Sequence, residues 1–229
     1  MDPIPSVICT VDVVLLTLQQ DSLHAALLLR ERKPYAGQLA LPGGYVHTEQ
    51  DADTQDAALR VLREKTGIIP PYLEQLATFS GPARDPRGWS VSVAYTALAP
   101  LHTLQAGGLG GPKSGAVRLI DVNHLPALPF DHAHIIAAAR ERVRLKSQYS
   151  SLPCHFAGEQ FTLPKLQKIY ESLLGEPLNK VSFRRKIQEM DMLEEVPGVQ
   201  EATGAHRPAQ VYRLKAAYRD AISRLERGL

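Results

Sequence analysis

This chain of 229 residues has only two cysteines, no long hydrophobic run and no strong excess of charge of one sign. The two cysteines, Cys9 and Cys154, lie far apart in sequence, which excludes a disulfide framework and a CxxC metal knuckle. The apolar run from Val7 to Leu18 is interrupted by Asp12 and is shorter than the roughly 20 residues of a membrane span. It also lacks the basic leader of a secretory signal. We therefore expect a cytoplasmic protein that does not enter a membrane.

The overall charge is close to neutral. The formal net charge is only +2, so nucleic-acid binding would need a local basic patch rather than a basic chain. A composition of 44% hydrophobic and 22% charged residues is that of an ordinary soluble globular protein. The length is at the border between one domain and two.

Strand-like and helix-like segments alternate up to about residue 150. Two strands are expected within 7–32, on either side of a polar turn at 19–22. The Pro42-Gly43-Gly44 sequence should interrupt regular structure, and the glycine-rich stretch 104–115 predicts a mobile surface loop. Further strands are predicted at 73–80, 89–98 and 116–122, and helices at 51–67 and 131–149. This alternation predicts an α/β layered domain over residues 1–150.

The pattern changes after residue 150. Residues 150–161 have no periodicity and are predicted to be a linker. Two helices should follow, with Thr162 and Asn179 as N-caps and Gly175 ending the first. Two short strands at 193–196 and 209–214 flank the turn-rich stretch 197–208. Helix, turn, helix and hairpin is the order of a winged helix, which we assign to residues 151–229.

The stretch 41–68, "LPGGYVHTEQDADTQDAALRVLREKTGI", resembles the Nudix box, G-x5-E-x7-R-E-U-x-E-E-x-G-U, of Nudix hydrolases. Fifteen residues separate Gly44 from Arg60, where the family has thirteen, and the expected loop glutamate falls on Gln50 or Ala52. Val61 and Lys65 replace two further glutamates. The positions that match are Gly44, Arg60, Leu62, Glu64, Gly67 and Ile68.

The substitutions in this box remove most of a metal site. In the family, carboxylates at i, i+3 and i+4 share one helical face and hold magnesium against a diphosphate. One carboxylate of four survives here, as Glu64, and the ammonium of Lys65 opposes a cation. We expect no bound magnesium, no required cofactor and no efficient hydrolysis. The alternative to a residual metal contact for Glu64 is a structural ion pair with Arg60, four residues earlier.

A diphosphate pocket is still expected around this loop. In "GPARDPRGW", Arg84 and Arg87 suit phosphate groups, and Asp85 suits ribose hydroxyls. The alternative is a solvated turn with an internal Arg–Asp pair. The pocket interpretation is favoured because Nudix proteins related to ADP-ribose pyrophosphatases carry a similar RDPRG turn. Further along the chain, His132 and His134 are expected to be structural. The predicted effector-binding residues are Arg30, Gly43, Gly44, Arg60, Glu64, Arg84, Asp85 and Arg87.

The second predicted helix of the C-terminal segment is strongly basic. Val181, Phe183 and Ile187 are available to a core, while the charged side chains could enter a major groove. Arg207 lies at the predicted hairpin tip, where a wing could reach phosphates. The alternative is a solvated basic face on a protein-interaction domain. The predicted DNA-binding residues are Lys180, Ser182, Arg184, Arg185, Lys186 and Arg207.

Taken together, these segments resemble the Nudix-related transcriptional regulators of NAD metabolism, the NrtR group. The shared segments include "RDPRGWSV", "FTLPKLQ", "SFRRK" and "HRPAQVYRL". The resemblance implies an α/β (α+β) Nudix sandwich, a mixed β-sheet between helices, followed by a C-terminal winged helix domain. It also implies a homodimeric bacterial repressor of a palindromic operator, with ADP-ribose or a related NAD derivative as effector.

Two rival interpretations remain open. One is a working magnesium-dependent ADP-ribose pyrophosphatase that uses Glu64 with acidic loop residues such as Glu49, Asp51 or Asp53. The other is a related regulator of sugar catabolism with a different effector.

Overall fold

The computed structural model describes residues 6–106, 117–201 and 208–218. The chain forms two compact units, Met1–Thr17 with His24–Arg140, and Leu18–Leu23 with Glu141–Leu229. The division cuts one helix, α3 (His132–Ser147), and also the two strands that meet at residues 20–21. None of the described helices is long and apolar enough to cross a membrane.

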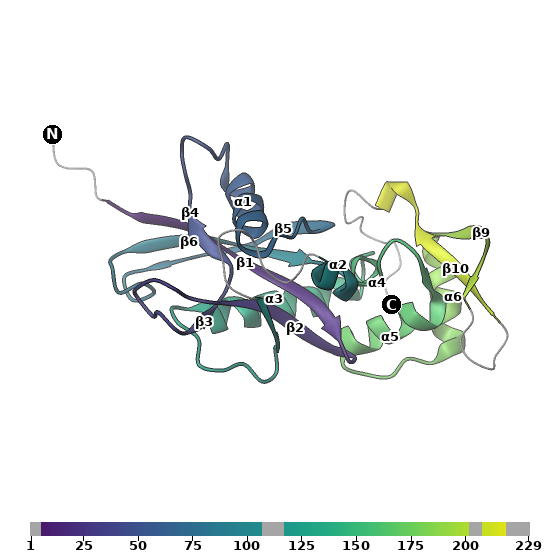
Figure 1. Cartoon of the computed structure of the whole chain (residues 1–229). Helices are drawn as coiled ribbons and strands as arrows, with labels where there is room; N and C mark the ends of the chain where they lie inside the picture. Colours follow the sequence, from purple (N-terminus) through teal and green to yellow (C-terminus); the bar gives the residue numbers. More distant parts are fainter. Residues whose placement is uncertain (1–5, 107–116, 202–207, 219–229) are drawn as a thin grey trace. The chain divides into compact units, whose positions relative to one another are not determined.

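The first unit is built on a mixed sheet (Figure 1). Its strands run in the order β3-β2-β1-β6-β5, with β4 also paired to β1 and β7 to β2. The pairing of β1 with β6 is parallel, whereas β1 with β4, β2 with β3, β2 with β7 and β5 with β6 pair antiparallel. The strands are β1 (Ile8–Gln19), β2 (Ser22–Leu29), β3 (Leu39–Ala40), β4 (Gly43–Tyr45), β5 (Tyr72–Gly81), β6 (Ser90–Leu98) and β7 (Val117–Asp121).

Helices cover this sheet. Helix α1 (Thr54–Thr66) lies on one face and α3 on the other, while α2 (Leu101–Ala106) is short (Figure 1). The Asp53 side chain accepts hydrogen bonds from the first-turn N–H groups of α1, and Gly67 ends the helix with a positive φ of 71°. The apolar face of α1 packs on alternate residues of β1; the shared core includes Val11, Val13, Leu15, Ala57, Ala58, Val61 and Leu62. The predicted sandwich is confirmed.

Two local predictions for this unit were wrong in part. Pro42 does lie in a break between β3 and β4, but Gly43 and Gly44 form β4 and pair with Asp12 and Val11 of β1. Leu104–Ala106 belong to α2 and not to a loop, since Leu104 is buried in the core. The rest of the predicted glycine-rich loop, residues 107–115, lies outside the described residues.

The second unit has the element order of a winged helix. Two helices, α5 (Leu163–Leu174) and α6 (Lys180–Met190), precede β9 (Leu193–Glu201) and β10 (Ala209–Leu214). The antiparallel sheet has the order β8-β10-β9, with β8 at Phe161–Thr162. A short helix, α4 (Cys154–Ala157), comes before β8, and a 3-10 turn at Ala216–Tyr218 follows β10.

The predicted end residues of both main helices are found at the helix ends, but only one of the two predicted N-cap side chains makes capping hydrogen bonds. The Asn179 side chain accepts hydrogen bonds from the N–H groups of Val181 and Ser182 at the start of α6. Gly175 ends α5 with a φ of 80°. Thr162 precedes α5 as predicted, but its side chain makes no capping hydrogen bond.

Three details of this unit differ from the prediction. Residues 150–161 are not a linker: residues 150–157 are buried, and Cys154–Ala157 form α4. Strand β9 continues to Glu201, through part of the stretch predicted as a turn. Val181 is not in the core but is 76% exposed, whereas Phe183 and Ile187 are buried as expected.

Candidate functional site

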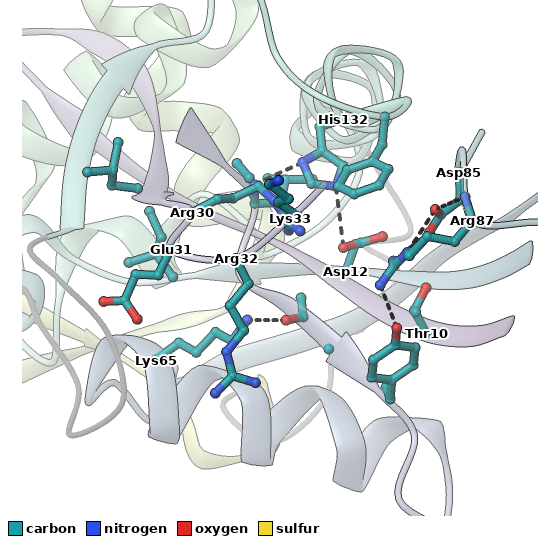
Figure 2. Close-up of a pocket in the computed structure, with 18 of the residues that line it drawn as sticks. Thr10, Asp12, Arg30, Glu31, Arg32, Lys33, Lys65, Asp85, Arg87 and His132 are labelled. Carbon is teal, nitrogen blue, oxygen red and sulfur yellow. Dashed lines mark hydrogen bonds and ion pairs between the residues drawn. The ribbon is translucent and has the colours of Figure 1, made fainter. Parts of the chain in front are cut away.

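One cavity of about 550 Å³ lies in the first unit (Figure 2). Its volume is within the usual range of small-molecule sites, about 300–1,000 Å³. Segments far apart in sequence form its wall: β1, the β2–β3 connection, β4, the end of α1, the loop before β6 and the start of α3. Six Arg or Lys and three Asp or Glu side chains line it, a formal excess of three positive charges when histidine is not counted.

Asp12 of β1 is the buried polar centre of this wall. It accepts a hydrogen bond from the Ser92 hydroxyl at 2.7 Å, and its carboxylate lies 3.6 Å from Nε2 of His132. Nδ1 of His132 accepts from the Leu41 N–H at 3.1 Å, so the ring proton is on Nε2, facing Asp12. Burial alone raises the pKa of Asp12, but hydrogen bonds from His132 and Ser92 and the charge of Arg84 lower it to about 2. Asp12 is therefore a fixed anion.

The glycine at position 43 is required by this carboxylate. A Cβ atom built on Gly43 would lie 2.1 Å from Oδ1 of Asp12 and 3.0 Å from the carbonyl oxygen of Val11. A Cβ on Gly44 would approach only Cγ2 of Val61, at 3.0 Å. The two glycines bring the β4 backbone close to β1 and α1, as the cavity wall requires.

The two residues that replace the Nudix glutamates both face this glycine pair. Val61 is 1% exposed and packs against Gly44. The Lys65 ammonium donates to the carbonyl oxygen of Gly43 and lines the cavity (Figure 2). Burial, followed by the charge of Arg30, lowers the pKa of Lys65, against the opposing charges of Asp12 and Glu64.

Arg84 is held on several sides by the protein. Its guanidinium donates to both carboxylate oxygens of Asp131, at 2.9 and 3.1 Å, and to the Ser90 hydroxyl at 3.2 Å. It also lies 3.4 Å from Asp12. The side chain is 7% exposed, so Arg84 positions Asp12 and the start of α3 while it lines the cavity.

Arg87 and Asp85 form the internal ion pair that was the alternative for this turn. Nε and Nη2 of Arg87 reach the two carboxylate oxygens of Asp85, at 2.9 and 2.6 Å. The hydrogen bond from Arg87 is the main reason why the pKa of Asp85 is lowered. Arg87 also donates to the Tyr45 hydroxyl (Figure 2). Its side chain remains 36% exposed. Within this turn, Arg87 is thus accessible to a ligand, whereas Asp85 is 3% exposed.

The β2–β3 connection adds three further cations to the wall: Arg30, Arg32 and Lys33. Arg30 donates from Nε to the Pro34 carbonyl at 3.0 Å and lies 4.9 Å from the centre of the Phe130 ring. Burial and the charge of Arg87 lower the pKa of Arg30. The positive charges are close enough to repel one another, which an anionic ligand would relieve.

Two predicted effector-binding residues do not line the cavity. Arg60 donates to both oxygens of Asp51, at 2.7 and 2.8 Å, and to the Tyr45 carbonyl at 2.9 Å. Glu64 lies 3.8 Å from Arg60 as its i+4 partner. Arg30, Gly43, Gly44, Arg84, Asp85 and Arg87 do line it.

Two of the three acidic loop residues named by the hydrolase interpretation, Asp51 and Asp53, are also engaged in structure. Asp51 is bound by Arg60, and this hydrogen bond lowers its pKa to about 2. Asp53 caps α1. In the described parts of the chain, no group of three or more His, Cys, Asp or Glu side chains is placed to hold a metal ion. A methyl-bearing side chain and an ammonium, from Val61 and Lys65, are a poor donor set for magnesium, which requires oxygen ligands.

The second candidate surface is the exposed face of α6. Lys180, Ser182, Arg184 and Arg185 are exposed, and Lys186 is partly buried. Arg185 lies 3.8 Å from Glu189 in an exposed i,i+4 pair. Phe183, Ile187 and Met190 anchor the other face, and the ring of Phe183 packs edge-on against Tyr170 at 5.5 Å. Arg207 lies outside the described residues.

The turn between α5 and α6 is fixed by side-chain hydrogen bonds. The Glu171 carboxylate accepts from the Leu178 N–H at 2.9 Å, and Gln167 donates to the Leu178 carbonyl at 2.9 Å. This fixes the angle at which α6 presents its charges.

Sequence reasoning missed several residues of the cavity wall. Asp12 carried a signal, a lone charge inside an apolar strand, and the run Glu31–Lys33 carried another, its dense charge next to the predicted Arg30. His132 was expected to be structural, and its hydrogen bonds are, yet it also lines the cavity. Lys65 was recognised only as an obstacle to a metal.

Known proteins share this arrangement. A NUDIX domain model matches residues 9–139, and a model described as the NrtR DNA-binding winged helix domain matches 153–214. A protein of Acinetobacter baylyi named "ADPR responsive transcriptional repressor NtrR" is 41% identical over 209 residues, 91% of this chain and 82% of that protein.

Solved structures agree. NrtR of Shewanella oneidensis, complexed with a 27mer DNA, is 38% identical with a TM-score of 0.86, covering 96% of this chain and 99% of that one. The NUDIX domain of the same protein, complexed with ADP ribose, is 36% identical with a TM-score of 0.54, covering 62% and 93%. The chain therefore belongs to the NrtR family, with a NUDIX domain followed by a winged helix domain.

Proposed function

We propose that this protein is a cytoplasmic transcriptional repressor of NAD-metabolism genes, released from its operator when ADP-ribose binds the NUDIX domain. The relative in Acinetobacter is named as a transcriptional repressor and as ADPR responsive. The Shewanella protein has been crystallised with DNA and, as a NUDIX domain, with ADP ribose. The observation that carries the proposal is the cavity, whose lining has an excess of three positive charges. A diphosphate ester carries about two negative charges, which such a lining neutralises.

Loss of hydrolysis is part of this proposal. The Nudix reaction requires metal ions that polarise phosphorus and activate water. Val61 and Lys65 stand where two of the metal carboxylates would be, and Asp51 is bound to Arg60. We propose that no metal cofactor is required and that bound ADP-ribose stays intact, so that an occupied sensor remains occupied.

DNA binding is assigned to the α6 face, with Lys180, Ser182, Arg184, Arg185 and Lys186 as contacts. A helix with exposed cations at its N-terminal turns suits the major groove, where such residues contact phosphates and base edges. The wing containing Arg207 is proposed as a further contact. We also propose a homodimer, since two recognition helices then address the half-sites of a palindrome.

Two assays on the purified full-length chain test this function. Isothermal titration calorimetry with ADP-ribose should show saturable binding. Incubation with ADP-ribose and Mg²⁺ should yield no AMP and ribose 5-phosphate, and rapid release of these products would establish the pyrophosphatase instead. If a phosphorylated sugar displaced ADP-ribose and bound with higher affinity than ADP-ribose, the result would favour a regulator of sugar catabolism.

A further inference from the structure

The Lys65 ammonium has a defined place in the cavity wall. It extends from the last turn of α1, donates to the Gly43 carbonyl and borders the cavity beside Arg30 and Arg32, whose charges act on it (Figure 2). The backbone contact restricts the long side chain. Part of the conformational entropy that lysine usually loses on binding is therefore lost before the ligand arrives.

The competing possibility is a metal ion bound beside Lys65, and the neighbouring residue on the same helical face offers no ligand for it. Val61, one turn earlier, fills the space against Gly44, so neither an ion nor its hydration water has an oxygen donor from this position. The helix thus presents one apolar group and one cation towards β4, where a hydrolase of this type presents carboxylates. Local charge in the wall is positive without a metal.

An ammonium performs one task of a bound divalent ion and not the other. It carries positive charge and three N–H donors, so it can bind the Gly43 carbonyl and a phosphate oxygen together. It has no coordination sites for water, so it generates no hydroxide nucleophile. Recognition of the diphosphate and its hydrolysis are thereby separated.

We propose that Lys65 binds the diphosphate of the effector in place of a divalent metal ion, which makes effector binding independent of magnesium. This rests on the proposed function in taking ADP-ribose as the effector; the recognised chemistry is a diphosphate ester. Arg30, Arg32 and Arg87 complete the positive wall around that group.

Calorimetry on the full-length protein tests this with two probes, ADP-ribose and ADP, each in EDTA and in Mg²⁺. Wild-type affinity for ADP-ribose should differ by less than twofold between the two conditions. Lys65→Gln should lose about 10- to 100-fold in both, the range expected for one charge-assisted hydrogen bond. Lys65→Arg, which keeps the charge, should lose less. Lys65→Glu should lose most in EDTA and regain affinity when Mg²⁺ is added.

Arg63→Gln is the matched control, because Arg63 is an exposed cation on α1 outside the cavity lining. It should bind like the wild type, and thermal denaturation of each variant checks that the fold is kept. The proposal is overturned if Lys65→Gln binds within twofold of the wild type, or if Mg²⁺ raises wild-type affinity tenfold. It is also overturned if neither probe binds in EDTA. Lys65-dependent binding of ADP without binding of ADP-ribose would reject the effector and retain the role of Lys65.

Discussion

The cavity of the NUDIX domain and the exposed face of α6 both carry positive charge, but they hold it in different ways. In the cavity, Arg84 and Arg87 are fixed by carboxylates, and Lys65 is fixed by a backbone carbonyl. On α6, Arg184 and Arg185 are exposed, and the ion pair from Arg185 to Glu189 is long at 3.8 Å.

This difference fits two kinds of ligand. Fixed, partly buried charges lose little entropy on binding and are weakly screened by salt, so they suit one small anion in one orientation. Exposed charges are strongly screened and adaptable, so they suit a polyanion whose counterions are released on binding. Effector binding should therefore respond weakly to salt, and DNA binding steeply.

The largest expected effect comes from breaking the fixed side of this comparison at Gly43. Gly43→Ala should lower the free energy of unfolding of the NUDIX domain by ~3 kcal/mol, because the methyl group displaces Asp12 from its hydrogen bonds. Gly44→Ala is the matched variant and should cost about 1 kcal/mol, since only the Val61 side chain must move. Urea unfolding followed by circular dichroism measures both. Equal losses would show that Asp12 does not impose the glycine.

A smaller effect is expected on the exposed side. Arg184→Ala and Arg185→Ala should each weaken operator binding by about tenfold and reduce the slope of log affinity against log salt by about one, as loss of one phosphate contact does. Binding of ADP-ribose should be unchanged. Fluorescence anisotropy with labelled operator DNA at several salt concentrations provides the measurement.

Arg144→Ala is a suitable control for these variants, because Arg144 is a surface cation already bound by Glu141 at 2.8 Å. It should leave DNA affinity within twofold. If both α6 variants retained normal affinity and normal salt dependence, the recognition surface would lie elsewhere.

The smallest effect is expected at Glu64, the carboxylate that survives in the Nudix box. Its partner at 3.8 Å is Arg60, and a partly exposed i,i+4 pair contributes ~0.5 kcal/mol or less. Glu64→Gln should therefore change the free energy of unfolding and the free energy of ADP-ribose binding by no more than ~0.5 kcal/mol each, with or without Mg²⁺. A loss of Mg²⁺-dependent affinity in calorimetry would instead reveal a metal ligand at this position.

Much of the fold could be predicted because local signals agree with the tertiary structure. Asp53 and Gly67 mark the ends of α1, and Asn179 marks the start of α6, by hydrogen bonds within a few residues. Residues 150–161 were misread because a short buried segment has no period to detect. Val181 was misread because helical spacing alone does not say where an apolar stripe ends.

The site was less predictable because long-range contacts define it. Asp12 and His132 are 120 residues apart in sequence, and no local pattern joins them. The sequence placed Lys65 on the metal-facing side of α1, but its contact with the Gly43 carbonyl depends on the pairing of β4 with β1. Arg60 was predicted to bind the effector because it matches a position in the sequence pattern of the Nudix box. In the structure its side chain binds Asp51 instead of lining the cavity.

The most direct test of a metal-independent sensor is release of operator DNA by ADP-ribose in the presence of EDTA. Fluorescence anisotropy would follow the DNA, and chromatography of the same sample would follow the nucleotide. We predict that DNA is released in EDTA while ADP-ribose remains intact. Release that requires Mg²⁺, or that proceeds only as AMP accumulates, would contradict sensing without hydrolysis.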